Sequence, residues 1–261
     1  MSINYDDLIQ KHHRSVRPWQ LFKEILFLCM MLFIGYAVFI YASLPDVSNL
    51  QRVNPDTTAL MQLRLDQAAR TGQNIRIRQQ WVSFNTIPKL LKQAVRVSED
   101  GAFYLHEGVD FNELKEAIKE NWQEKTVVRG ASTITQQLAK NLYLTTDRSL
   151  TRKLKEYFIT RRLEKHLSKN RIFHIYLNII EFGPGVFGVQ AASRHFFNKP
   201  VQYLNMAEIM RLAAVIPKPL RVKANGDSGW LKWKCRWILR TLQRYGYIDE
   251  KQYRLTLVNF E

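Results

Sequence analysis

The residues best suited to acid–base chemistry are carboxyl groups in two separate stretches. Glu99 and Asp100 end an apolar helical pattern, and Glu156 stands in a strongly basic stretch. A carboxyl group lodged among apolar side chains has a raised pKa, which suits a general base that takes a proton from a hydroxyl group. The alternative is a solvated acid pair at a helix end, with Phe103 in the core and His106 bonded to the backbone. The acidic stretch alone favours this alternative.

Basic residues surround Glu156 at helical spacing. Arg152 precedes Glu156 by four residues and Lys153 precedes it by three, so the three side chains share one helix face. Arg148 and Lys140 add positive charge nearby in the sequence. Exposed ion pairs are ordinarily worth little stability. Guanidinium and ammonium groups also neutralise a departing diphosphate, with a carboxylate held beside them. Both interpretations stay open.

A polar run between these two stretches is unusual for a helix that only fills a core. Ser, Thr and Asn are mediocre inside helices, but they cap free N–H groups at a helix start. The positive end of a helix also suits an anionic ligand. A capped helix with a polar face is the simpler interpretation, and the flanking acidic and basic stretches weaken it. The residues of interest in the run are Gly130, Ser132, Thr133, Gln136, Gln137, Lys140 and Asn141.

Residues 25–44 are long and apolar enough to cross a membrane. They carry no charge, and as a helix they would span roughly 30 Å, the thickness of one hydrocarbon core. Basic residues before this segment predict a cytoplasmic N-terminus. Cleavage as a signal peptide after Ala42-Ser43-Leu44 is the weaker alternative. We therefore predict a cytoplasmic segment 1–24, a transmembrane helix 25–44, a linker 45–56 and an exterior domain 57–261.

The net charge of +16 and the pI of about 9.9 indicate an anionic partner. Nucleic acid, an anionic membrane surface and a phosphorylated substrate all fit that charge. A basic domain tethered to a bilayer makes nucleic acid a poor partner and anionic lipid a good one. Because Cys29 lies in the predicted span, no disulfide with Cys235 is expected. The six histidines show no metal-ligand spacing.

The exterior domain is predicted to be mostly α-helical. Apolar periodicity and capping residues place the helices, one of them beginning at Pro88 and one capped by Asn112. Residues 75–84 alternate like a strand, and the glycines from Gly183 to Gly188 mark a turn. The helices are expected over residues 57–70, 88–98, 112–125, 132–144, 149–167, 171–180, 189–197, 205–216, 229–245 and 249–258.

These stretches, in this order, are similar to the motifs of the peptidoglycan glycosyltransferases of glycosyltransferase family 51. The resemblance runs from about Thr57 to Lys223. Within the family, the sequence most resembles the monofunctional biosynthetic transglycosylases. Two positions depart from the pattern: His174, where the family often has Glu, and Asn198, where Gly is common. The matching residues are Glu99-Asp100-x-x-Phe103-x-x-His106-x-Gly108, Gly130-x-Ser132-Thr133-Ile134-Thr135-Gln136-Gln137-x-x-Lys140-Asn141, Arg152-Lys153-x-x-Glu156, Lys169-x-x-Ile172 and Tyr176-Leu177-Asn178.

The resemblance implies a mainly α, lysozyme-like domain with a smaller membrane-proximal lobe. It implies a periplasmic domain held at the bacterial inner membrane by one transmembrane helix. The implied reaction is inverting: lipid II is polymerised into β-1,4-linked glycan strands, and undecaprenyl diphosphate is released. Because the sequence has no Ser-x-x-Lys and ends at Glu261, no transpeptidase activity is expected. Apolar residues around Leu142, Tyr143 and Leu144 fit shallow contact with lipid.

The resemblance also implies roles for individual residues. Glu99 is the general base, and the basic residues stabilise the departing diphosphate. For Glu156 three roles stay open: orienting the basic residues, binding a divalent cation such as Mg2+ shared with the diphosphate, or assisting the donor. The implied substrate-binding residues are Asp100, Phe103, His106, Gly130, Ser132, Thr133, Gln136, Gln137, Lys140, Asn141, Arg148, Arg152 and Lys153.

The implied partners are lipid II, polyprenyl-diphosphate-linked glycan and membrane lipid, with cell-wall synthesis or division proteins as further candidates. Two rival functions remain. A lytic muramidase would also use a carboxylate in an α domain, without needing diphosphate-binding cations or a retained anchor. A membrane-tethered, non-catalytic scaffold would use the basic residues to bind anionic lipid.

Overall fold

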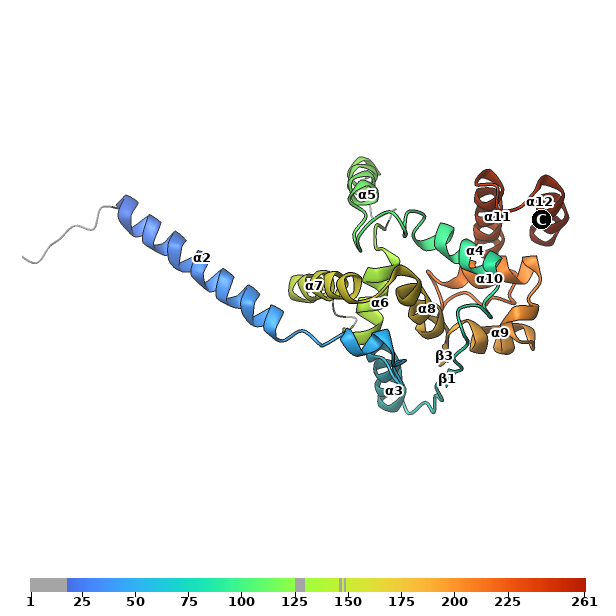
Figure 1. Cartoon of the computed structure of the whole chain (residues 1–261), viewed down its shortest axis with the longest axis horizontal. Helices are drawn as coiled ribbons and strands as arrows, with labels where there is room; N and C mark the ends of the chain where they lie inside the picture. Colours follow the sequence, from blue (N-terminus) through green and yellow to red (C-terminus); the bar gives the residue numbers. More distant parts are fainter. Residues whose placement is uncertain (1–17, 125–129, 146, 148) are drawn as a thin grey trace, which may run out of the picture. The chain divides into compact units, whose positions relative to one another are not determined.

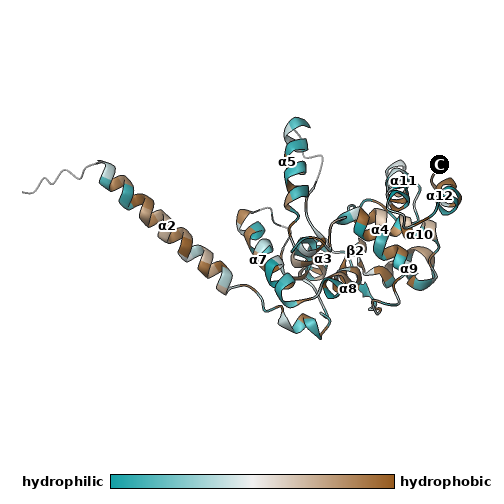
Figure 2. Ribbon diagram, turned by 45° about the horizontal axis from the view of Figure 1, so that its top comes forward, coloured by the Kyte–Doolittle hydropathy of each residue, from teal (hydrophilic) through white to brown (hydrophobic). Residues whose placement is uncertain are grey.

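The computed structural model describes residues 18–124, 130–145, 147 and 149–261. The chain divides into two compact units, Met1–Leu44 and Pro45–Glu261. The first unit holds helix α2 (Pro18–Ala42), which Figure 2 shows to be apolar along most of its length. Residues Trp19–Ala42 are long and apolar enough to cross a membrane. The predicted apolar helix is confirmed, and its described part starts at Pro18, seven residues before the expected start.

The second unit is mainly helical, as predicted, and Figure 1 shows its elements in chain order. Short 3-10 turns, η1 (Ser48–Gln51), η2 (Val201–Tyr203) and η3 (Val258–Phe260), complete the helical content. Its α-helices are α3 (Ala59–Arg70), α4 (Lys89–Glu99), α5 (Phe111–Glu124), α6 (Ile134–Tyr143), α7 (Leu150–His166), α8 (Lys169–Ile179), α9 (Val189–Phe197), α10 (Met206–Val215), α11 (Gly229–Arg244) and α12 (Glu250–Leu257).

Helices α6, α8 and α10 carry the core of this unit. Helix α8 is buried on nearly all sides from Ile172 to Ile179, which is typical of a helix enclosed by other elements. Helix α6 packs against α3, α7 and α8, and α10 packs against α4 and α11. This arrangement fixes the start of α6 and the end of α4, the two places where the polar side chains described below converge.

A small sheet joins segments that are distant in the sequence. Strand β1 (Arg78–Gln79) runs parallel to β3 (Val186–Phe187), which pairs antiparallel with β2 (Glu181–Gly183). The strand expected over residues 75–84 is therefore wrong in extent. The strand ends early because the Asn178 side chain bonds to the backbone of Val82 in place of a neighbouring strand. It accepts from the Val82 N–H at 2.9 Å and donates to the Val82 carbonyl at 3.2 Å. The predicted glycine turn is the β2–β3 connection.

Capping side chains set most helix starts. Ser149 caps α7, as its position before the helical pattern indicates, and Asp249 caps α12. The predicted Asn112 cap is wrong, because the Asp110 carboxylate accepts from Glu113 N at 2.9 Å and caps α5 two residues earlier. At the end of α9, Asn198 adopts the left-handed conformation with φ of 56°. Asn is among the few non-glycine residues that tolerate this conformation, which explains why it can stand where Gly is common.

We expect Gly188→Ala to destabilise the second unit. Gly188 has φ of +78°, and an added Cβ would lie 2.4 Å from the carbonyl oxygen of Asn178. Strain and backbone displacement should cost about 2 kcal/mol or more. The thermal midpoint of the full chain in detergent should fall by about 4 °C or more. Gly229→Ala, with no atom within 4 Å of the added Cβ, should leave it unchanged; equal midpoints would contradict this account.

Candidate active site

Glu99 is a partly buried carboxyl group at the C-terminal end of α4. The amide of Gln137 on α6 donates to its Oε2 at 3.1 Å, and the Ser98 hydroxyl donates to its Oε1 at 3.2 Å. Burial raises the pKa of Glu99, while the Gln137 hydrogen bond and the charge of Lys234 oppose that rise. A carboxylate with a raised pKa that is supported by neutral donors suits proton abstraction near neutral pH.

Glu156 is a buried carboxylate with two cationic partners. It is 3% exposed on α7, its Oε2 accepts from Arg152 Nη1 at 2.7 Å, and its Oε1 accepts from Lys153 Nζ. The shared helix face is confirmed. The alternative of a solvated surface ion pair is wrong, because Glu156 lies inside the protein. Half of the Lys153 side chain stays exposed, so its positive charge remains available to a ligand.

Lys140 connects the two acids electrostatically. It lies on α6, which packs against α7, and burial lowers its pKa while the charges of Glu156 and Glu99 both raise it. Arg152 and Lys153 act on the same ammonium group in the opposite sense. Lys140 follows Gln137, which bonds to Glu99, by three residues on α6, and α6 packs against the helix that carries Glu156, Arg152 and Lys153. The two acids and these cations therefore lie in one cluster.

Asp100 and His106 fix the loop after α4, next to this cluster. The Asp100 carboxylate accepts from Ile134 N at 3.0 Å and lies 2.9 Å from His106 Nε2. His106 Nδ1 accepts from Gly108 N at 3.1 Å, so the proton of a neutral ring lies on Nε2 and is donated to Asp100. The Thr133 hydroxyl donates to the Gly108 carbonyl at 2.7 Å. These bonds join the loop after α4 to the first turn of α6.

The polar run divides into capping and cleft-facing residues. Thr133 and Gln136 form a reciprocal capping box at the start of α6, so the capping interpretation is confirmed for them. Ser132 is exposed, whereas Gln137 and Lys140 are partly buried on the face of α6 that meets the acids. The remaining predicted residues lie as follows: Gly130 is exposed, Phe103 and Asn141 are buried, and Arg148 lies outside the described residues.

Sequence reasoning missed two contributors to the Glu99 environment. The charge of Lys234 acts on Glu99 from α11, which packs against α4, and the interleaved Lys and Trp residues of α11 are the only sequence signal for it. Tyr176, which the sequence singles out only as part of a family motif, is fully buried, and its hydroxyl donates to Gln137 Oε1 at 2.9 Å. Asn178 in the same motif has a structural role through its bonds to Val82.

The donor set around Glu156 does not fit a resident divalent cation. Both carboxylate oxygens already accept from Arg152 and Lys153, and Lys140 adds a third positive charge. Among residues 18–124, 130–145, 147 and 149–261, no three His, Cys, Asp or Glu side chains gather as a metal site. A cation would need oxygen ligands that this basic cluster does not supply.

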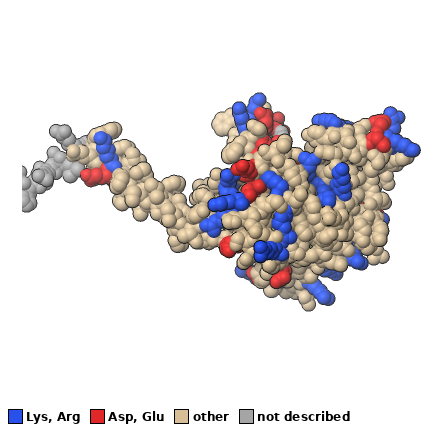
Figure 3. Space-filling model, viewed as in Figure 1, with Lys and Arg blue, Asp and Glu red and all other residues tan. Residues whose placement is uncertain are grey.

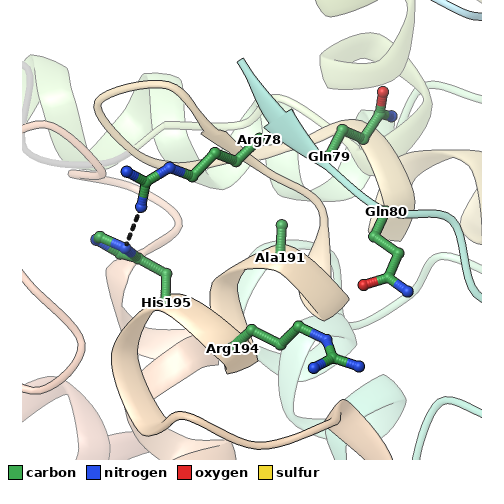
Figure 4. A pocket seen from close by; sticks show the side chains of 6 residues that line it. All are labelled: Arg78, Gln79, Gln80, Ala191, Arg194 and His195. Atoms are coloured by element: carbon green, nitrogen blue, oxygen red, sulfur yellow. Dashed lines mark hydrogen bonds between the residues drawn. The ribbon is translucent and has the colours of Figure 1, made fainter. Parts of the chain in front are cut away.

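Two cavities have neither Glu99 nor Glu156 in their lining. One, of about 360 Å3, is bordered by Phe84 and Lys92, with Lys92 Nζ 4.2 Å from the Phe84 ring centre. Figure 4 shows the other, of about 280 Å3, where Arg78 of β1 points towards His195 of α9. Basic side chains border both cavities, consistent with the wide spread of Lys and Arg on the face shown in Figure 3.

An apolar stripe on α5 is exposed to solvent. Phe111, Ile118 and Trp122 are 69%, 59% and 84% exposed and follow helical spacing along one face. Tyr143 is partly buried. The lipid contact expected around Leu142, Tyr143 and Leu144 is wrong for the two leucines, because both of their side chains are less than a tenth exposed. They pack inward because α6 is enclosed by α3, α7 and α8.

The chain is similar to known transglycosylases over most of its length. A family sequence model described as "Transglycosylase" matches residues 67–243. The "Biosynthetic peptidoglycan transglycosylase" of Methylobacillus flagellatus is 40% identical over 229 residues, 88% of this chain and 98% of that protein. Proteins of the same name are 41% identical in Nitrosospira multiformis, over 71% of this chain and 81% of that protein, and 46% identical in Citrobacter koseri, over 64% and 69%.

We expect Asp100→Ala to destabilise the protein more than a surface change does. The substitution leaves the Ile134 N–H and the His106 ring without their buried acceptor, at a cost of about 2–4 kcal/mol. The thermal midpoint of the full chain should fall by about 4 °C or more. Ser132→Ala removes a hydroxyl from an exposed residue on the same segment and should leave the midpoint unchanged. An unchanged midpoint in Asp100→Ala would mean that Asp100 does not support this segment.

Proposed function

This chain belongs to the transglycosylase family, and we propose that it is a peptidoglycan glycosyltransferase that polymerises lipid II into β-1,4-linked glycan strands. One observation carries the proposal. Glu99, a carboxyl group whose pKa burial raises, shares a cluster with a second acid that holds two cations. A base beside a cationic site is what a transfer from a diphosphate donor requires.

We infer an inverting displacement. The 4-hydroxyl of N-acetylglucosamine on the acceptor lipid II attacks C1 of N-acetylmuramic acid on the donor. Glu99 takes the hydroxyl proton as the new C1–O bond forms. The bond from C1 to the diphosphate breaks, and undecaprenyl diphosphate leaves with the electron pair. Attack from the face opposite the α-linked diphosphate gives the β-linkage.

The basic cluster stabilises the charge that builds up on the leaving diphosphate. Lys140, Arg152 and Lys153 are preorganised for this role; Arg148 lies outside the described residues, and its part in the cluster stays a prediction from the sequence. Of the three roles considered for Glu156, the ion pairs to Arg152 and Lys153 favour the first, orientation of the cations. Because the donor set does not fit a resident cation, the proposed reaction uses none, and a Mg2+ ion brought by the substrate would take its oxygens from the diphosphate.

Both substrates carry polyprenyl tails, so the site must work at a bilayer surface. Helix α2 supplies a membrane anchor by length and composition, and α5 offers an exposed apolar stripe. We propose that the anchor crosses the bacterial inner membrane with its N-terminus in the cytoplasm and the catalytic unit in the periplasm. We propose no transpeptidase step, since no Ser-x-x-Lys occurs in the sequence, and we leave cell-wall synthesis or division proteins as candidate partners.

The two rival functions, a muramidase and a non-catalytic scaffold, explain fewer features of the site than a glycosyltransferase does. Hydrolysis of a glycan requires two carboxyl groups that flank the sugar bond, whereas Glu156 is enclosed by Arg152 and Lys153. A lipid-binding scaffold would need the basic residues but would gain nothing from a partly buried Glu99. Consumption of lipid II with growth of long chains separates the proposed function from both.

We expect Glu99→Gln to lower lipid II polymerisation by roughly a hundredfold or more, the scale of general-base loss. The assay follows glycan chains on a gel, with the purified full chain in detergent. Glu107→Gln is the matched control, because Glu107 is an exposed acid with a weak pair to Arg161 at 3.3 Å, and it should keep wild-type activity. A wild type that makes no polymer beside an active control enzyme would overturn the proposed function.

We expect the apolar stripe of α5 to enter the bilayer. A fluorophore attached through Ile118→Cys in a Cys29→Ser background should be quenched by nitroxide lipids in nanodiscs. The same label at Leu255→Cys, 65% exposed on α12, should not be quenched. Cys235 should stay unlabelled, because burial raises its pKa to about 12 and the thiol is not exposed. Equal quenching at both positions would contradict a membrane role specific to α5.

A further inference from the structure

A short chain of hydrogen bonds runs from the core to the proposed base, Glu99. The Tyr176 hydroxyl on α8 donates to Gln137 Oε1 at 2.9 Å. The other end of the same amide, Gln137 Nε2, donates to Glu99 Oε2 at 3.1 Å. Three elements, α8, α6 and α4, therefore meet through one side-chain amide.

The orientation of the Gln137 amide decides how it acts on Glu99. Its two ends have nearly the same shape, but one donates and the other accepts. With the NH2 end towards Glu99, the amide stabilises the carboxylate. With the carbonyl towards Glu99, it could bond only to the protonated acid, and it would hinder ionisation.

We propose that Tyr176 is a positioning residue that holds the amide of Gln137 with its NH2 group towards Glu99 and so keeps the base ionised for proton abstraction. The inference rests on the proposed function of Glu99. Tyr176 has 0% exposure on α8, so packing fixes its ring and leaves its hydroxyl directed at the amide. Its role differs from core filling, because a phenylalanine would fill nearly the same volume without donating.

The hydroxyl keeps its proton under the conditions of the reaction. Burial, together with the charges of Glu99 and Asp100, raises the pKa of Tyr176 well above its usual value. Tyr176 is therefore a donor throughout the range in which a carboxyl group titrates. Without that donor, Gln137 Oε1 would lack the partner seen here, and the carboxylate-binding orientation of the amide would lose its preference.

Other charged groups also act on Glu99, and they stay in place when Tyr176 changes. Asp100, next in the chain, raises the Glu99 pKa, and Lys234 from α11 lowers it. Lys140 from α6 interacts with Glu99 as well, and the Ser98 hydroxyl bonds to it. A shift caused by Tyr176→Phe therefore reports the hydrogen bond through Gln137.

The test compares pH profiles of lipid II polymerisation for the wild type, Tyr176→Phe, Gln137→Leu and the double variant. Because the reaction needs ionised Glu99, its rate rises as the pH rises through the Glu99 pKa. Loss of one hydrogen bond to a charged group should move this acid limb up by about one pH unit. Tyr176→Phe and Gln137→Leu should each show the shift. The double variant should shift no further than Gln137→Leu, because Tyr176 acts through the amide.

Tyr104→Phe is the matched control. It also removes one hydroxyl near the site, which bonds to Asn170 Oδ1 at 3.0 Å, and it should leave the acid limb unchanged. The proposal would be overturned if Tyr176→Phe shifted the acid limb equally in the wild-type and Gln137→Leu backgrounds. It would also be overturned if Tyr176→Phe alone left the acid limb unshifted.

A second readout does not depend on activity. In protein labelled with 13C at the glutamate carboxyl carbons, the Glu99 signal is assigned by its loss in Glu99→Gln, and its pKa is followed by NMR. We expect this pKa to be about one unit higher in Tyr176→Phe than in the wild type. An unchanged pKa in folded Tyr176→Phe overturns the positioning role. Failure of the wild type to make polymer would count against the proposed function alone.

Discussion

A charged group that is buried away from water must pair with another group or become neutral. The two acids of this site meet that constraint in different ways. Glu156 is buried and takes a cation on each oxygen, so it serves to hold positive charge in place. Glu99 has mainly neutral donors, Gln137 and Ser98, and its pKa rises. The same constraint thus produces a fixed cationic site and a proton acceptor.

Helix α6 makes this arrangement possible, because it packs against α7 and α8 and its residues bond to the loop after α4, to Glu99 and to Tyr176. Its first turn is held by Asp100 and Thr133 to the loop after α4. Its middle presents Gln137 to Glu99, and its last turn presents Lys140 towards both acids. A polar helix start in a buried position is stable only when each N–H group finds an acceptor. The residues that cap α6 therefore also place the chemistry.

The sequence predicts those parts of the structure that depend on neighbours in the chain. Helices with an apolar stripe and a hydroxyl or acidic cap, such as the one begun by Ser149, appear where expected, and so does the shared face of Arg152 and Glu156. The errors come from contacts between distant segments. The side chain of Asn178 shortens the strand before Val82, and no local pattern contains that information. Lys234 is a contributor of the same kind, because its effect on Glu99 depends on how α11 packs against α4.

The buried tyrosine shows how a core residue can take part in chemistry without touching a substrate. A core position selects for volume, and phenylalanine would supply it at Tyr176 with no polar group to satisfy. The hydroxyl is retained at a fully buried site, where it is tolerated only with a partner. Its partner is the Gln137 amide, which also contacts Glu99. The core thus determines which end of Gln137 the base meets, and through it the pH range in which the base is ionised.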